Sequence, residues 1–127
     1  MRDIKFRAWS EYSNKLVVWE HMKVDDTLGS VLNGEDKKIH VMQYTGLKDK
    51  NGREIYEGDL YQYTVSHDMY DPNSGHITFE TKHVKAVTFE NGAFYHGIEL
   101  LSDVLEYDDS LVCVGNIYEN PELLEAQ

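Results

Sequence analysis

Cysteine is almost absent from this sequence, with Cys113 the only one in 127 residues. An internal disulfide is therefore excluded, and the apolar run Leu111 to Val114 predicts a buried, inert thiol. Proline occurs twice, and no proline, glutamine or serine tract predicts disorder. No apolar run is long enough to cross a membrane, and Met1 to Trp9 alternates charged and apolar residues, unlike a signal peptide. We expect one domain over residues 1–127, located in the cytoplasm.

Basic residues are scarce in the second half of the chain. The net charge is −11, and from Leu60 to Gln127 there are two basic residues against twelve acidic ones. Up to Asp59 the charges nearly balance, with ten basic and eleven acidic residues. Because attachment to phosphate backbones needs clustered lysine and arginine, direct nucleic-acid binding is disfavoured. A solvated acidic surface that aids solubility is the simplest explanation.

Familiar motifs of catalysis are missing as well. The sequence contains no nucleophile elbow, no phosphate-cradling glycine loop, no cysteine pair and no His-Glu-x-x-His pattern. We therefore assign no catalytic residue, no cofactor and no metal ligand.

The first strands are recognisable from their side-chain pattern. Residues Ile4 to Trp9 alternate apolar and charged side chains, which suits a half-buried strand, and Leu16 to Trp19 is a run of β-formers. A hairpin through Ser13 and Asn14 would join them. Residues Glu20 to Lys38 show no clear period and predict an irregular loop with at most one short strand.

The segment from Met42 to Asp59 predicts a hairpin, because Asn51 and Gly52 both tolerate positive φ. A two-residue turn would set Asp49 opposite Glu54, with like charges facing. A three-residue connection with Gly52 left-handed gives pairs worth about 0.2–1 kcal/mol each and is favoured. Those pairs are Asp49 with Arg53, Lys48 with Glu54, and Leu47 with Ile55. Gly58 and Asp59 then predict a second turn.

The second half predicts a strand from Leu60 to Val65, a polar loop from Ser66 to Gly75 and a long β-ribbon after it. The ribbon is expected over Val84 to Glu90 and Ala93 to Glu99, with Asn91-Gly92 as a two-residue turn that places Phe89 opposite Phe94 and Val87 opposite His96. Further along the chain we expect a short helix near Leu100 to Leu105, a buried strand at Leu111 to Ile117, and a helical turn at Asn120 to Leu124. The fold class is mainly β: a small barrel-like or folded antiparallel sheet with a long β-ribbon and one or two short helices.

Four groups of polar or aromatic side chains are candidate sites. His67, Asp68, Asp71 and His76 share the predicted loop and could converge on a metal, although a polar loop is the simpler interpretation. The other groups are the acid cluster Asp103, Glu106, Asp108 and Asp109, the carboxylate pair Glu57 and Asp59, and the tyrosines Tyr61, Tyr63, Tyr70 and Tyr95. For the acid cluster the favoured interpretation is a charged, solvated rim. For Glu57 and Asp59 it is a structural turn. The tyrosines could form an aromatic contact surface, and His96 is expected on a face of the ribbon.

Three blocks of the sequence form a recognisable pattern: Ile4 to Trp9, Met42 to Asp59, and Val114 to Leu124, which begins with Val-Gly-Asn-Ile-Tyr-Glu-Asn-Pro. Together they resemble the YopX family of bacteriophage and prophage proteins. The resemblance implies a β-rich phage-encoded protein of unknown biochemical function, without established catalytic residues.

Three functional hypotheses follow. The leading one is a non-catalytic accessory protein that binds an unidentified host or phage protein, also forming a homo-oligomer through an exposed ribbon edge. The second is an acidic nucleic-acid mimic that inhibits a host DNA-binding enzyme. The third is a metal-dependent hydrolase that uses the loop from His67 to His76. Binding of single-stranded nucleic acid on the aromatic residues of the ribbon is a weaker, fourth hypothesis, because the negative net charge opposes it.

Overall fold

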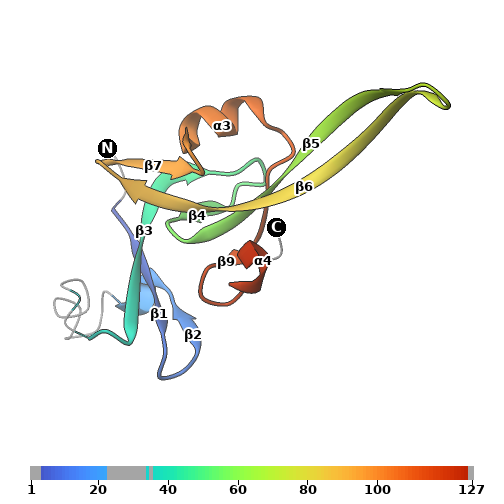
Figure 1. The fold of residues 1–127 in the computed structure, drawn as a ribbon. Helices are drawn as coiled ribbons and strands as arrows, with labels where there is room; N and C mark the ends of the chain where they lie inside the picture. Colours follow the sequence, from blue (N-terminus) through green and yellow to red (C-terminus); the bar gives the residue numbers. More distant parts are fainter. Residues whose placement is uncertain (1–3, 23–33, 35, 126–127) are drawn as a thin grey trace. The chain divides into compact units, whose positions relative to one another are not determined.

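The computed structural model describes residues 4–22, 34 and 36–125. The chain forms two compact units, Met1–Gly58 and Asp59–Gln127, and each contains its own antiparallel sheet (Figure 1). Three short helices are present in the described part of the chain. The expected mainly β fold is therefore confirmed. The single domain expected over residues 1–127 stays a prediction.

The sheet of unit 1 has the strand order β2-β1-β3-β4. The elements of this unit are β1 (Phe6–Ser10), β2 (Lys15–Val17), α1 (Trp19–Met22), β3 (Ile39–Lys48) and β4 (Glu54–Tyr56). The first predicted hairpin is confirmed, since β1 and β2 pair from Ala8↔Val17 to Ser10↔Lys15. Strand β2 ends before Trp19, which instead begins α1 and packs its ring 5.7 Å from that of Phe6.

The irregular loop predicted over Glu20 to Lys38 lies mostly outside the described residues. Its first three residues belong to α1, and its last three form a turn in which Asp36 accepts the Lys38 amide at 2.9 Å.

The hairpin between β3 and β4 has the predicted three-residue connection. Lys48 pairs with Glu54, the Asp49 amide donates to the Arg53 carbonyl at 2.9 Å, and Gly52 has φ +81°. The Asp49 carboxylate accepts the backbone amides of Asn51 and Arg53 at 2.9 and 3.0 Å. The turn is thus held by a side chain that caps backbone groups, rather than by paired charges alone.

The pairing of Leu47 with Ile55 is not part of this register, which shifts between Tyr44 and Lys48. Gly46 has φ +84° within the shift, and the buried Thr45 hydroxyl donates to the Ile55 carbonyl at 2.8 Å while accepting the Leu47 amide at 3.1 Å. A bulge satisfied by the threonine replaces the uniform ladder assumed from the sequence.

Unit 2 contains a sheet with the strand order β8-β7-β6-β5-β9. Its elements are β5 (Asp59–Asp71), β6 (Gly75–Glu90), β7 (Ala93–His96), β8 (Glu99–Leu100), α3 (Leu101–Tyr107), β9 (Val112–Asn116) and α4 (Glu122–Glu125). The two-residue turn at Asn91-Gly92 is confirmed by the pairs Phe89↔Phe94 and Val87↔His96. Both predicted helices are present.

The loop predicted from Ser66 to Gly75 is wrong. Strand β5 continues to Asp71 and pairs with β6 from Leu60↔Ala86 to Asp71↔Gly75, so only Pro72, Asn73 and Ser74 lie between the strands. Asp71 accepts the Asn73 and Ser74 amides at 2.7 and 3.2 Å, and Gly75 has φ +81°. Within this segment only Pro72 to Ser74 form a tight turn. The side chains from Ser66 to Asp71 point alternately to the two faces of β5.

Each unit has a core of its own. In unit 1 the buried apolar side chains are Ala8, Met42, Tyr44, Ile55 and Tyr56. In unit 2 they are Leu60, Tyr61, Val84, Val87, Leu101, Val104 and Leu111. The predicted buried strand at Leu111 to Ile117 is only half-buried along β9, since β9 is an edge strand of its sheet.

Candidate functional site

The distal part of the β5–β6 hairpin, residues 66–81, is a two-stranded ribbon that we call the arm. Strand β9 pairs with β5 only over Asp59–Gln62, and β7 pairs with β6 only over Val87–Glu90. No residue of the arm is buried. Figure 1 shows it extending away from α3, β7 and β9 of the same unit. Because isolated two-stranded hairpins are marginally stable in water, such an arm is suited to gain packing from a partner.

Alternation along the two strands gives the arm an apolar face. Directly opposed residues share a face, so the pairs His67↔Phe79 and Met69↔Ile77 lie on the same side of the ribbon. The His67 and Phe79 rings stack with centroids 4.8 Å apart. Met69 and Phe79 are 51% and 43% exposed, although burying such a side chain contributes about 1.5–3 kcal/mol. This face, formed by His67, Met69, Ile77 and Phe79, is the best candidate for a contact surface.

Hydrogen bonds hold the apolar face in place near its root. The Thr81 hydroxyl bonds the Nε2 atoms of His67 and His83 at 2.8 and 2.9 Å. The His83 ring stacks on Tyr63 with centroids 5.3 Å apart. The contacts of Thr81 with His67 and of His83 with Tyr63 cross from one strand to the other and hold these side chains in place, so the face is partly pre-organised for binding.

The opposite face of the arm is polar. Asp68 accepts a hydrogen bond from the Thr78 hydroxyl at 2.8 Å and lies 3.3 Å from His76 Nε2. Ser66 and Glu80 pair on the same side. Tyr70, which is 74% exposed, also lies on this face.

The four ligands weighed for a metal do not converge. His67 and Asp71 lie on one face of the ribbon, whereas Asp68 and His76 lie on the other. The polar-loop interpretation and the metal-site hypothesis both assumed that residues 66–75 form a loop, and the strand overturns that assumption. Within the described ranges, no three histidine, cysteine, aspartate or glutamate side chains are grouped as metal ligands.

The four tyrosines of the predicted contact surface also separate. Tyr61 is fully buried in the core, and Tyr63 and Tyr95 are half-buried. Only Tyr70 is exposed, and it faces the other way from Tyr61 and Tyr63 along β5. The exposed apolar residues Met69 and Phe79 are absent from the predicted contact surface, because the predicted loop contains Met69 and the predicted ribbon begins only at Val84, after Phe79. Pairing His67 with Phe79 and Met69 with Ile77 across a three-residue turn would have revealed them.

A hollow of about 390 Å³ lies at the root of the arm. It is lined by Tyr63, Thr64, Val65, Ser66, Lys85, His96, Glu99, Val104, Tyr107 and Asp108. His96 is 5% exposed, and its Nε2–H donates to the Tyr61 carbonyl at 3.1 Å. Burial lowers the pKa of this imidazole below its usual value, which keeps it neutral.

Other polar groups of this hollow are bonded to one another. The Tyr107 hydroxyl donates to Glu99, and this bond raises the pKa of Tyr107 to about 12. The Asp108 carboxylate accepts the amide and hydroxyl of Ser110 at 2.9 and 2.5 Å, and the Ser110 hydroxyl accepts the Thr64 amide at 3.0 Å. The hydrogen bonds therefore anchor the root of the arm to the segment after α3. His96 lies on the ribbon, as expected, and its hydrogen bond to the Tyr61 carbonyl is structural.

The remaining candidates have structural surroundings. Glu57 accepts the Gln43 amide at 3.2 Å, and Asp59 is fully buried at the start of β5. Cys113 is half-buried and donates weakly to the Gly115 carbonyl at 3.7 Å, so its expected full burial is wrong, because β9 is an edge strand.

The four side chains of the acid cluster do not form one buried site. Asp103, Glu106 and Asp109 are exposed, whereas Asp108 is half-buried at the end of α3. The net charge divides at the boundary between the units: ten basic and ten acidic residues precede Asp59, and two basic against thirteen acidic residues follow from it. Unit 2 therefore carries the whole net charge of −11.

These observations define a class: a β-rich protein of two antiparallel sheets whose acidic unit presents a solvent-open arm. A model of the YopX family, described as YopX protein, matches residues 5–125, so the chain belongs to the YopX family. The crystal structure of protein EF1440 from Enterococcus faecalis is similar, with a TM-score of 0.64 and 27% identity over 98% of this chain and 99% of that chain. No curated protein matched in a separate comparison. Among the described helices, none is long and apolar enough to span a membrane.

Proposed function

We propose that this YopX family protein is a phage or prophage accessory protein, acting in the bacterial cytoplasm without catalysis, that binds a protein of the host or the phage through the arm. The observation that carries the proposal is the apolar face of a two-stranded ribbon left open to solvent at Met69 and Phe79. A partner would complete the packing that the ribbon lacks.

Charge narrows the kind of partner. Unit 2 has a net charge of −11, so a partner with an apolar strip bordered by lysine and arginine is electrostatically complementary. A second copy would bring two units of the same charge together, which opposes association. A homo-oligomer through the same face is therefore the less favoured occupant.

The test compares variants of the full chain in partner capture followed by calorimetry with the purified partner. The double variant Met69→Ser, Phe79→Ser removes the apolar face. Ile98→Ser is the matched control, because Ile98 is 92% exposed and lies outside the arm. Loss of about 2 kcal/mol or more at such anchors corresponds to about 30-fold weaker binding, whereas the control should change binding less than twofold.

Two results would contradict the proposal. One is a partner that binds the double variant as tightly as the unchanged chain. The other is turnover of a substrate that the double variant retains in full. Light scattering on the same samples detects the homo-oligomer, whose dissociation by the double variant would assign the face to a second copy.

A nucleic-acid mimic is the second candidate, and the observation in its favour is the confinement of the whole net charge to unit 2. It predicts that the captured protein is a DNA-binding enzyme displaced by duplex DNA. Neutralising Asp103, Glu106 and Asp109 to the corresponding amides would then weaken binding more than the double variant of the arm does. A metal-dependent hydrolase is disfavoured, because its four candidate metal ligands are divided between the two opposite faces of the ribbon.

A further inference from the structure

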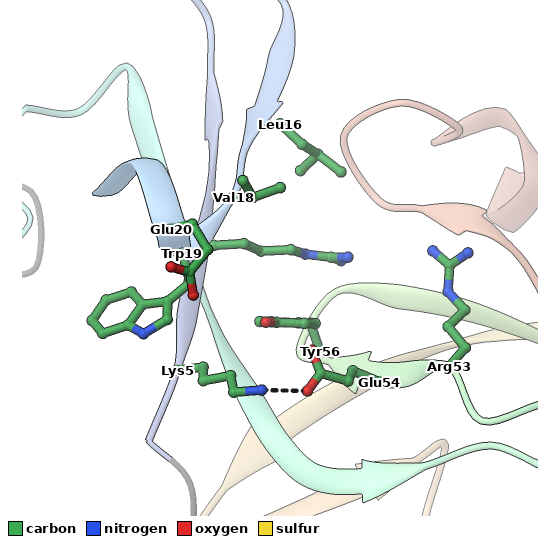
Figure 2. A pocket seen from close by; sticks show the side chains of 9 residues that line it. Lys5, Leu16, Val18, Trp19, Glu20, Arg53, Glu54 and Tyr56 are labelled. Atoms are coloured by element: carbon green, nitrogen blue, oxygen red, sulfur yellow. Dashed lines mark hydrogen bonds and ion pairs between the residues drawn. The ribbon is translucent and has the colours of Figure 1, made fainter. Parts of the chain in front are cut away.

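A second hollow, of about 380 Å³, lies in unit 1 (Figure 2). None of the residues that line it belongs to the arm. Small-molecule sites typically measure roughly 300–1,000 Å³, so it could hold a small ligand. The side chains around it are three cations, two acids, two aliphatic residues and two aromatic ones: Lys5, Arg7, Arg53, Glu20, Glu54, Leu16, Val18, Trp19 and Tyr56. The cations are therefore in excess.

Arg7 supplies a buried cation from the middle of the sheet. It is 7% exposed, and its guanidinium carbon lies 4.7 Å from the centroid of the Tyr56 ring. One of its nitrogens, Nη2, donates to the Met42 sulfur at 3.6 Å, which is a weak acceptor. Stacking on the ring fixes the plane of the guanidinium, so the group is pre-organised for a flat two-oxygen partner.

The charge of Lys5 is compensated within the hollow. Its Nζ donates to Glu54 at 2.6 Å, as the dashed line in Figure 2 shows, and it also lies 5.3 Å from the Tyr44 ring centroid. Glu20 is the other acid that lines the hollow. Figure 2 shows Arg53 on the opposite side of the hollow from Glu20.

The apolar wall comes from the end of β2. Figure 2 shows Leu16 and Val18 side by side along one rim, whereas the Trp19 ring is turned away from the hollow and packs on Phe6. Val18 is 50% exposed, so covering it with a ligand would remove apolar surface from water.

We infer that this hollow binds a small molecule that has one oxyanion, a phosphate or a carboxylate, attached to an apolar body. The oxyanion is held by Arg7 and Arg53, because a guanidinium offers paired N–H donors that match two oxygens of either group. The apolar body lies against Leu16 and Val18. The site belongs to unit 1 and does not depend on the arm.

The experiment is a titration of the ¹⁵N-labelled full chain followed by nuclear magnetic resonance. The probes are phenyl phosphate, phenylacetate and inorganic phosphate. The two organic probes share an apolar ring and differ in the oxyanion, so the tighter one identifies which oxyanion the site prefers. We expect shifts at the amides of β1 and β4, and at least tenfold tighter binding of the better organic probe than of inorganic phosphate.

Arg53→Gln is the main variant, because Arg53 is exposed and its loss should leave the fold intact. We expect it to weaken the better probe at least tenfold. Lys48→Gln removes an exposed positive charge of the same hairpin that does not line the hollow, and it should change affinity less than twofold. Arg7→Lys keeps the charge but loses the planar fork, and it should also weaken binding at least tenfold while the spectrum stays that of a folded protein.

Three results would overturn the inference. They are the absence of shifts at the lining residues at millimolar probe, an equal affinity for inorganic phosphate, or equal weakening by Lys48→Gln and Arg53→Gln. None of these three results tests the arm, so the inferred ligand site and the proposed function are tested independently.

Discussion

Gly52 is the residue at which a turn most directly requires glycine. Its φ is +81°, and a Cβ built there would meet no atom within 4 Å, so the cost of a side chain is conformational rather than steric. We expect Gly52→Ala to lower the free energy of unfolding of unit 1 by about 1–2 kcal/mol. Asn51→Ala, at an exposed neighbour without positive φ, should cost less than about 0.5 kcal/mol. Urea unfolding followed by tryptophan fluorescence measures both, since Trp9 and Trp19 lie in unit 1. Equal losses would refute the conformational argument.

His96 makes the stability of unit 2 depend on pH. Burial lowers the pKa of its imidazole in the folded state, so the unfolded chain takes up a proton first as the pH falls through about 6.5. Stability is therefore lost below that pH, by at most about 1.4 kcal/mol between pH 7.5 and 5.5 for one group. His96→Gln should flatten this part of the profile, because its amide can still donate to the Tyr61 carbonyl without titrating.

The matched control is Ile98→Gln, at a side chain of the same unit that is 92% exposed and carries no titratable group. It should leave the slope between pH 7.5 and 5.5 unchanged. Urea unfolding followed by far-ultraviolet circular dichroism gives the slopes, and a His96→Gln protein as pH-dependent as the unchanged chain would remove His96 as the cause.

At the scale of elements, β5 and β6 differ in stability along their length. Their root carries the buried residues Leu60, Tyr61 and Val84, whereas residues 66–81 contain no buried residue. Local opening should therefore cost less in the arm than at the root. Hydrogen–deuterium exchange should show arm amides exchanging at least tenfold faster than those of Leu60–Gln62, and a purified partner should slow the arm selectively. Uniform protection along both strands would contradict this prediction.

At the scale of the whole molecule, the charge difference between the units predicts different responses to salt. Unit 2 repels itself with a net charge of −11, whereas unit 1 is neutral overall. Raising sodium chloride from 20 to 500 mM shortens the screening length to a few ångström and should slow amide exchange in unit 2. Peptides from unit 1 provide the internal control. An equal change in both units would mean that the salt acts through something other than net charge.

Local chemistry in the sequence determined the turns and much of the fold class. Gly52 and the pair Asn91-Gly92 adopt positive φ and lie between strand-forming residues, so both hairpins and their connection lengths were predicted, as was the short helix after Leu100. These features depend on neighbours a few residues apart, whose preferences act without the rest of the chain.

Tertiary structure decided which polar segment is a strand and which residues reach solvent. The run from Ser66 to Gly75 has loop composition, yet its first six residues pair with residues 75–80 of β6 across a three-residue turn, because that strand supplies the partners of the backbone ladder. The same pairing puts Met69 and Phe79 on one face and separates the supposed metal ligands. The hollow beside Arg7 likewise requires β1, the end of β2 and β4 to meet. A sequence pattern registers periodicity within a segment, whereas a contact surface depends on which segments lie together, and only the fold specifies that.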